Sequence, residues 1–337
     1  MRTCPLIHLP LELIEQIVLG LPNSDIKSLR LTCTHLHRSS QLRLSRIFLS
    51  PNPLDVSVFR AVADHDELRK KVVEIIYDDA RLDHPYEPPN AGYFNEYYDE
   101  YFDEDYGDAH GVPLWFRRIY HENYNAIESY GREDVKRSHH LEVQERFNAP
   151  LSPAESYGQY QKLAQEQEQT IATNSDADAL KYGLPRFPNL RRITLTPAAH
   201  GEPQRPFYPT PTIRSLPRGL IYPIPRGWPV AEEQSNEPFA GSWDGEEKRQ
   251  WRGFCLVSQA VAQHQRENPA VGISEFIVDS NQLLTGINCR VFDEAENTEY
   301  KDLVTIFARP GFSRIDLSLH VGGQDEEGWH SFRSGLL

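Results

Sequence analysis

The stretch Pro188-Asn189-Leu190-Arg191-Arg192-Ile193-Thr194-Leu195 aligns with a second one, Pro310-Gly311-Phe312-Ser313-Arg314-Ile315-Asp316-Leu317. Both carry the pattern apolar-x-x-apolar-x-apolar, whose last two apolar residues are two apart and therefore share one face of a β-strand. Two further copies occur at Val72/Ile75/Tyr77 and Ile273/Phe276/Val278. The four copies predict four short strands, each with one buried face.

Each copy follows a stretch with helical periodicity. These stretches are Val56–Val62, Ala177–Tyr182, Trp251–His264 and Tyr300–Ala308. A helix followed by a short strand of this pattern is the unit of leucine-rich repeats, whose strands stack into a parallel sheet covered by helices on one side. The sequence therefore predicts an α/β fold, an irregular leucine-rich-repeat-like solenoid. The strand centres lie 118, 83 and 39 residues apart, whereas regular repeats need about 20–29, so a generic α/β domain remains the alternative.

Composition excludes several functional classes. The net charge is −14, which argues against a nucleic-acid partner because phosphate binding needs clustered Lys and Arg. The sequence contains no stretch of 18 or more apolar residues, so it predicts no membrane span. The first ten residues lack the apolar core of a secretory signal. The four cysteines lie far apart and form no metal-binding spacing. We expect reduced thiols, no cofactor or metal, and a location in the cytoplasm, the nucleus or both.

Two segments differ in composition from the rest. Residues 86–108 hold eight acids, six tyrosines and no Lys or Arg, which predicts a mobile acidic insertion. Residues 203–229 hold eight prolines and four arginines, which predicts an extended, polyproline-like connection. Their opposite charges suggest that the two segments associate. A helix beginning at Ser152-Pro153-Ala154-Glu155 carries the signature of a capping box and is expected to be largely exposed.

The first fifty residues predict three short helices. The first runs from Leu9 to Pro22, Ser24 can cap a second that reaches about Leu31, and Thr34 can cap a third that carries Leu36. The first helix has two apolar stripes, one at positions 9, 13, 17 and 21 and another at 11, 14 and 18. A unit of about 40 residues can bury one stripe in its own small core. The other needs a cover, which is either a partner or the following domain.

These residues resemble the F-box. The resemblance rests on Leu9-Pro10-x-Glu12-Leu13-Ile14, Leu21-Pro22-x-x-Asp25-Ile26 and Leu29-Arg30-Leu31-Thr32-Cys33, the last of which is typical of F-boxes of filamentous fungi. Downstream pieces are also similar to fungal F-box proteins, among them Tyr222-Pro223-Ile224-Pro225-Arg226-Gly227-Trp228 and Arg309-Pro310-Gly311-Phe312. The sequence departs from many animal F-boxes at Leu36, where they have Trp. A helical cap on the α/β domain is the alternative for the N-terminus.

The resemblance implies a function and two domains. An F-box at residues 5–50 would bind a Skp-family adaptor, and through it a cullin, while residues 51–337 would hold an unidentified protein client for ubiquitin-dependent degradation. The adaptor-facing residues would be Leu9, Pro10, Leu13, Ile14, Ile17, Leu21, Ile26, Leu29 and Cys33. An F-box protein that binds the adaptor outside a ligase is a second possibility.

Catalytic signatures are not found in the sequence. It has no P-loop, G-x-G-x-x-G, H-E-x-x-H, G-x-S-x-G or EF-hand loop. His139 and His140 are adjacent and would point in different directions on a helix. The tryptophans at 228, 243, 251 and 329 are expected to pack in the core. We therefore expect a non-catalytic adaptor subunit, with an α/β enzyme of unfamiliar site as the alternative from another class.

Overall fold

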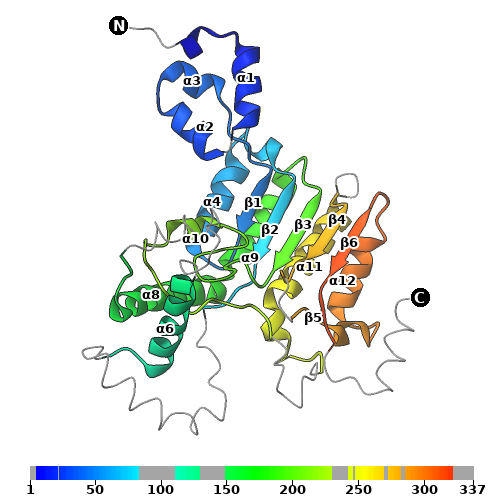
Figure 1. Cartoon of the computed structure of the whole chain (residues 1–337). Helices are drawn as coiled ribbons and strands as arrows, with labels where there is room; N and C mark the ends of the chain where they lie inside the picture. The colour runs from blue at the N-terminus through cyan, green and yellow to red at the C-terminus, as the bar shows by residue number, and fades with distance from the viewer. Residues whose placement is uncertain are drawn as a thin grey trace.

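Five parallel strands form the centre of the fold in the computed structural model, which describes residues 5–21, 23–82, 111–129, 149–229, 242–245, 247–268, 272–281 and 285–321. The strands are β1 (Arg46–Leu49), β2 (Glu74–Asp78), β3 (Arg192–Thr196), β4 (Glu275–Val278) and β6 (Arg314–Leu317). They lie in the sheet in the order in which they occur in the chain, as Figure 1 shows. A two-stranded parallel sheet joins β5 (Ile287–Asn288) to β7 (Leu319–His320). The predicted α/β class with a parallel sheet is confirmed.

The strand register agrees with the alignment made from the sequence. Ile75, Ile193, Phe276 and Ile315 are paired across neighbouring strands, and so are Tyr77, Leu195, Val278 and Leu317. Strand β1 was not predicted, although Leu44, Ile47 and Leu49 follow the same apolar pattern and Ile47 pairs with Ile75. Each strand therefore contributes the same two pattern positions to the same face of the sheet.

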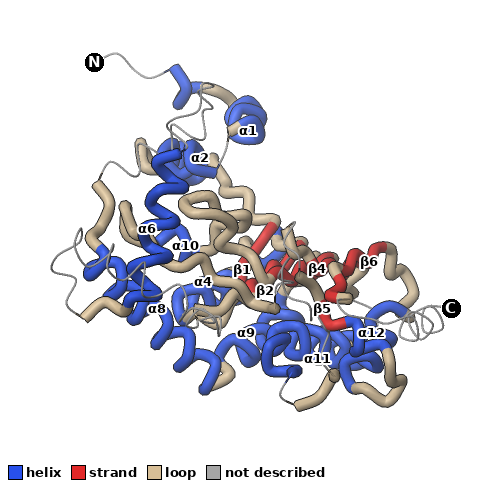
Figure 2. Tube along the Cα trace, turned by 60° about the horizontal axis from the view of Figure 1, so that its bottom comes forward, coloured by secondary structure: helices blue, strands red, loops and turns tan. Residues whose placement is uncertain are grey.

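Helices cover that face of the sheet except at the edge strand β6, where Ile315 is 48% exposed although a buried face was expected. They are α4 (Pro53–Asp64), α9 (Ser175–Gly183), α11 (Arg252–Glu267) and α12 (Thr298–Phe307), which agree with the four helical stretches predicted from the sequence. Phe59 of α4, Leu180 of α9 and Val257 of α11 are fully buried in one core with the strand residues. Figure 2 shows α9, α11 and α12 on one side of the strands. Helix α4 begins where Asn52 accepts a hydrogen bond from Leu54 N and Pro53 takes the first position.

The opposite face of the sheet carries a row of alternating charges. Arg46, Glu74, Arg192, Glu275 and Arg314 occupy one register row across the five strands. Arg46 Nε lies 2.7 Å from Glu74 Oε2, and Arg192 Nη2 lies 2.6 Å from Glu275 Oε2. Opposite charges on adjacent strands favour this pairing over a shifted one, in which these ion pairs would be lost.

The Pro-rich segment packs against the body and is more than a connection. It contains the short helix α10 (Pro211–Ser215), and its Leu220, Ile221 and Tyr222 are buried. These three residues share a second core with α6 (Leu114–Ser129) and α8 (Pro153–Ala172). Helix α8 begins with the predicted capping box at Ser152 and Glu155, and one of its faces is buried in this core. The acidic segment 86–108, predicted to be mobile, lies outside the described residues.

Three short helices precede the sheet and form a core of their own. They are α1 (Leu11–Gly20), α2 (Asn23–Arg30) and α3 (Thr34–Ser39), and Figure 1 shows them projecting from one end of the body. Ile14, Val18, Ile26 and Leu36 are their buried core residues. Arg43 ties the chain back to α1 by donating from Nη1 to Leu19 O (2.7 Å). The last residues of the range 5–50, which the sequence assigned to the helical unit, form strand β1 of the sheet, which starts at Arg46.

Candidate binding surfaces

The two apolar stripes of the first helix are buried unequally, because Leu9 and Leu21 at the ends of one stripe pack against the three-helix core while its middle residues are exposed. Ile14 and Val18, one turn apart, are buried in the small three-helix core, whereas Leu13 and Ile17 remain 44% and 41% exposed. Leu11 and Leu19 of the same helix are exposed further round its surface, and Leu31 follows α2 at 86% exposure. Among the described residues, the exposed stripe is therefore an apolar surface that the helical unit does not need for its own core.

The nine residues expected to face an adaptor fall into three groups. Pro10, Leu13 and Ile17 are exposed; Leu9, Leu21, Leu29 and Cys33 are half-buried; and Ile14 and Ile26 are fully buried in the three-helix core. Only the first group presents an open surface. The buried pair acts through the fold of the helices, since Ile14 and Ile26 hold α1 and α2 in place.

A second candidate surface lies at the carboxyl ends of the strands, which in parallel sheets share one edge. It is a pocket of about 1530 Å³, which we call the strand-end pocket. Its walls come from the segment after β2, from residues 223–229 of the Pro-rich segment, from residues 245 and 248–250, and from α9, α11 and α12. Ligands of open α/β sheets commonly bind at this edge. The pocket was not predicted from the sequence, although the pair Asp78-Asp79 at the end of an apolar strand is a usable signal.

Asp79 fixes one side of the strand-end pocket. Its buried carboxylate accepts hydrogen bonds from Trp228 Nε1 (2.8 Å), Gly253 N (2.9 Å) and Arg81 Nη2 (2.6 Å). Burial raises the pKa of Asp79, and the positive charge of Arg81 opposes that rise. The carboxylate thus joins the end of β2, the Pro-rich segment and the first turn of α11. Arg81 and Arg226 are also joined through their backbones, with Arg81 N donating to Arg226 O.

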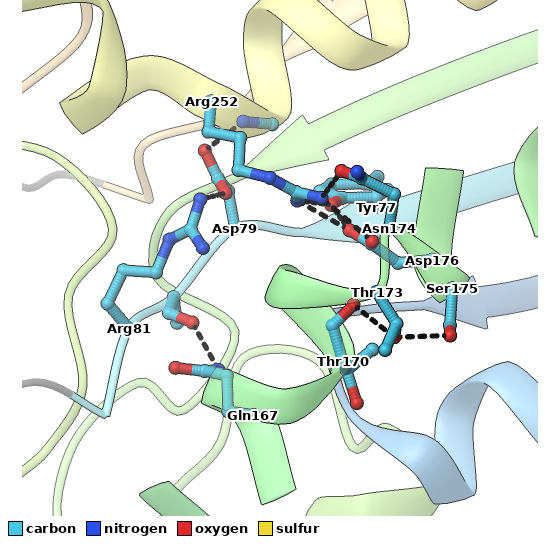
Figure 3. A network of polar contacts seen from close by, with 12 residues as sticks. Tyr77, Asp79, Arg81, Gln167, Thr170, Thr173, Asn174, Ser175, Asp176 and Arg252 are labelled. Carbon is cyan, nitrogen blue, oxygen red and sulfur yellow. Dashed lines mark hydrogen bonds and ion pairs between the residues drawn. The ribbon is translucent and has the colours of Figure 1, made fainter. Parts of the chain in front are cut away.

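Arg252 forms the neighbouring ion pair, drawn in Figure 3. Its Nη1 lies 2.6 Å from Asp176 Oδ2 and its Nη2 lies 2.9 Å from Asp176 Oδ1, so the guanidinium binds both carboxylate oxygens. Tyr77 Oη also donates to Asp176 (2.6 Å). Burial raises the pKa of Asp176, but the hydrogen bonds from Arg252 and Tyr77 outweigh it, so the pKa lies below its ordinary value. This pair connects α9 with α11.

Among the described residues, no group of three or more His, Cys, Asp or Glu side chains is arranged to hold a metal ion. Trp228 and Trp251 are buried in the core, as expected, and Trp243 packs against it while half-buried. Trp329, His139 and His140 lie outside the described residues.

Comparison with known proteins adds no relative. The sequence matches no protein-family model, no curated protein and no solved structure. Among the helices in the described ranges, none combines the length and apolarity that a membrane span requires.

Proposed function

We propose that this chain is the substrate-recognition adaptor of a ubiquitin ligase of the SKP–cullin–F-box type. The three N-terminal helices bind a Skp-family adaptor, and through it a cullin, while the α/β body holds a protein client. The chain itself is non-catalytic and works by positioning its client for ubiquitin transfer in the cytoplasm, the nucleus or both.

The single observation that carries the proposal is the exposed stripe of α1. Leu13 and Ile17 are open although the three-helix core is already complete with Ile14, Val18, Ile26 and Leu36. Full burial of a leucine or isoleucine side chain contributes about 1.5–3 kcal/mol. The burial free energy of several half-exposed aliphatic residues on one small unit thus favours a protein partner, because it offsets the cost of association.

The F-box resemblance supplies the identity of that partner. Leu13 and Ile17 are among the positions that the resemblance assigns to the adaptor interface. Leu36, which stands where many animal F-boxes have Trp, is buried in the three-helix core. That departure therefore affects the internal packing of the unit and leaves the exposed stripe of α1 unchanged.

The α/β body is suited to holding a client as an irregular leucine-rich-repeat-like solenoid. Its five strands follow chain order and repeat one apolar pattern, and the helices lie on one face. Ile47 and Ile75 are 28 residues apart, which is within the repeat length of about 20–29. Long insertions then separate the later units, and loops of this kind often carry binding residues.

The test is direct binding of the purified chain to a purified fungal Skp-family adaptor. The wild-type chain should bind, and Leu13→Glu/Ile17→Glu should weaken binding at least about 100-fold, because two charges would enter an apolar interface. Val304→Glu is the matched control, since Val304 is a 46% exposed aliphatic residue on α12 of the α/β body. Its affinity should equal that of wild type.

Two outcomes would refute the proposal. One is absence of adaptor binding by the wild-type chain, and the other is unchanged binding by the double variant with α2 and α3 still protected from hydrogen exchange. Recovery of a cullin with the tagged chain separates a ligase subunit from a Skp complex outside the ligase.

A further inference from the structure

We propose that the strand-end pocket binds an acidic peptide segment, through three cations that form no ion pair within the described part of the chain. The inference deepens the proposed function, because it rests on the body being the client-binding part and names the chemistry of the client.

The charges that line the pocket mostly neutralise one another. Arg81 pairs with Asp79, Arg252 with Asp176, and Lys248 with Glu299 at 2.9 Å. Asp302 of the same wall is 3.4 Å from Arg266. These four pairs are structural and present no net charge to a ligand.

Three lining cations remain outside these pairs within the described ranges. Lys181 lies exposed on α9, Arg249 lies exposed in the turn Glu247–Trp251, and Arg226 is half-buried in the Pro-rich segment. Asp178, exposed on α9, is the one lining acid with no ion pair in the same ranges. The surplus is two positive charges, in a chain whose net charge is −14. This local reversal of sign favours an anionic ligand.

Arg226 is the half-buried one of the three cations, and its contacts indicate most directly what the pocket binds. Its guanidinium donates from Nη2 to a carbonyl oxygen, Gly201 O, at 2.8 Å. The acid that attracts it, Glu202, precedes the Pro-rich segment and is itself bound to Arg205 at 2.9 Å. Burial lowers the pKa of Arg226, and the attraction of Glu202 does not offset that effect, because the guanidinium forms no direct ion pair with a described carboxylate. A bound carboxylate or phosphate would restore that missing interaction.

The size and lining of the pocket favour a peptide over a small molecule. About 1530 Å³ exceeds the roughly 300–1,000 Å³ typical of small-molecule sites. Half-buried apolar side chains, Ile171, Ile224 and Leu256, lie among the polar ones. They suit a peptide in which an acidic residue is flanked by apolar ones. A nucleic acid fits less well, because a surplus of two positive charges is small for a chain of phosphates, which is bound by clustered Lys and Arg.

The test begins with a displayed library of random twelve-residue peptides selected on the immobilised full-length chain. The selected peptides should be enriched in Asp and Glu, and one of them, synthesised with a fluorescent label, is then measured by anisotropy. Lys181→Gln/Arg249→Gln should weaken its binding at least about tenfold, and Arg226→Gln should do so as well. Arg214→Gln/Arg218→Gln is the matched control, since both arginines are exposed in the Pro-rich segment outside the pocket.

Further measurements determine whether the pocket prefers a carboxylate or a phosphate, and whether it binds a peptide or RNA. Replacing the critical acid of the selected peptide by phosphoserine should preserve or strengthen binding, whereas glutamine or serine should abolish it. Lys181→Gln/Arg249→Gln changes exposed side chains only, so its effect does not depend on altered folding. The proposal is overturned if no peptide is selected, if the selected peptides lack acidic residues, or if that variant binds the peptide like wild type. It is also overturned if a single-stranded RNA oligomer, and no acidic peptide, binds through Lys181 and Arg249.

The two proposals fail separately. The peptide assay uses no Skp-family adaptor, and Lys181→Gln/Arg249→Gln should keep wild-type affinity for that adaptor. Conversely, Leu13→Glu/Ile17→Glu should keep wild-type affinity for the selected peptide.

Discussion

Ile14 and Ile17 lie three positions apart on α1, but Ile14 is 1% exposed and Ile17 is 41% exposed. Three residues correspond to about 60° around a helix, because a turn takes 3.6 residues. That rotation is enough to move a side chain from the three-helix core to the surface of α1. The pair therefore separates what the helical unit needs for folding from what it offers to a partner.

We expect Ile14→Ala and Ile17→Ala to differ in their effect on the helical unit. Truncating a buried isoleucine costs about 2–5 kcal/mol, so Ile14→Ala should raise hydrogen exchange throughout α1, α2 and α3. Ile17→Ala should change the free energy of opening that hydrogen exchange reports for these helices by less than about 0.5 kcal/mol, as for most surface substitutions. Amides of β2 and β3 serve as the internal reference. Equal effects of the two variants would contradict the division of α1 into an internal and an exposed stripe.

Asp79→Ala should destabilise the α/β body by about 3–5 kcal/mol, the range for breaking one partner of a buried ion pair. The substitution leaves Arg81 without its carboxylate, and it leaves Trp228 Nε1 and Gly253 N without an acceptor. Urea denaturation midpoints measure the effect. Asp316→Ala on β6 is the control, since the Asp316 side chain is 57% exposed and should shift the midpoint little. A midpoint for Asp79→Ala close to that control would show that the carboxylate does not hold the three segments together.

Much of the sheet was predictable because its pattern is local. The positions Ile75, Ile193, Phe276 and Ile315 were aligned from the sequence and are paired in the structure. Strand β1 was missed although it has the same pattern, because its four residues directly follow the helical unit and were assigned to it. A strand this short is stabilised by its pairing with β2, and local sequence does not record that pairing.

The strand-end pocket could not be predicted in the same way. Asp79 meets Trp228 across 149 positions and Gly253 across 174. Neither contact has a periodic signature, because each joins a loop to another element through one polar side chain. The composition of the Pro-rich segment predicted an extended connection, whereas its Leu220, Ile221 and Tyr222 are core residues. Composition predicted its irregular backbone but not its packing.

The stability of the body should depend on pH through Asp78. Burial, together with the nearby carboxylates of Asp55 and Asp79, raises the pKa of Asp78 from 3.8 to about 7. The folded state therefore binds this proton more tightly than the unfolded chain. The associated stability is present below about pH 4, is lost as the pH rises to about 7, and stays constant above that. Each unit of pKa shift corresponds to about 1.4 kcal/mol.

Asp78→Asn isolates that contribution, because the new side chain stays neutral while its amide oxygen can still accept from Ala80 N, as the Asp78 carboxylate does at 3.0 Å. The denaturation midpoint of the variant should rise relative to wild type when the pH is changed from about 5 to about 8. Asp316→Asn removes one negative charge from an exposed strand position and should show no such trend. A difference between Asp78→Asn and wild type that is the same at both pH values would contradict the raised pKa.

Gly253→Ala should destabilise the protein, although alanine is normally the better residue in a helix by about 1 kcal/mol. Gly253 lies in the first turn of α11, where an added Cβ would be 2.5 Å and 2.6 Å from the two carboxylate oxygens of Asp79. Those oxygens are held by Trp228 and Arg81, so the carboxylate can move only by breaking its own hydrogen bonds. Gly158→Ala on α8 is the matched control, because Gly158 is exposed and a Cβ there would meet nothing within 4 Å. The same substitution should therefore lower the urea midpoint at position 253 and raise it at position 158. Stabilisation at both positions would mean that Asp79 is free to move, and that the wall of the strand-end pocket is not fixed by this carboxylate.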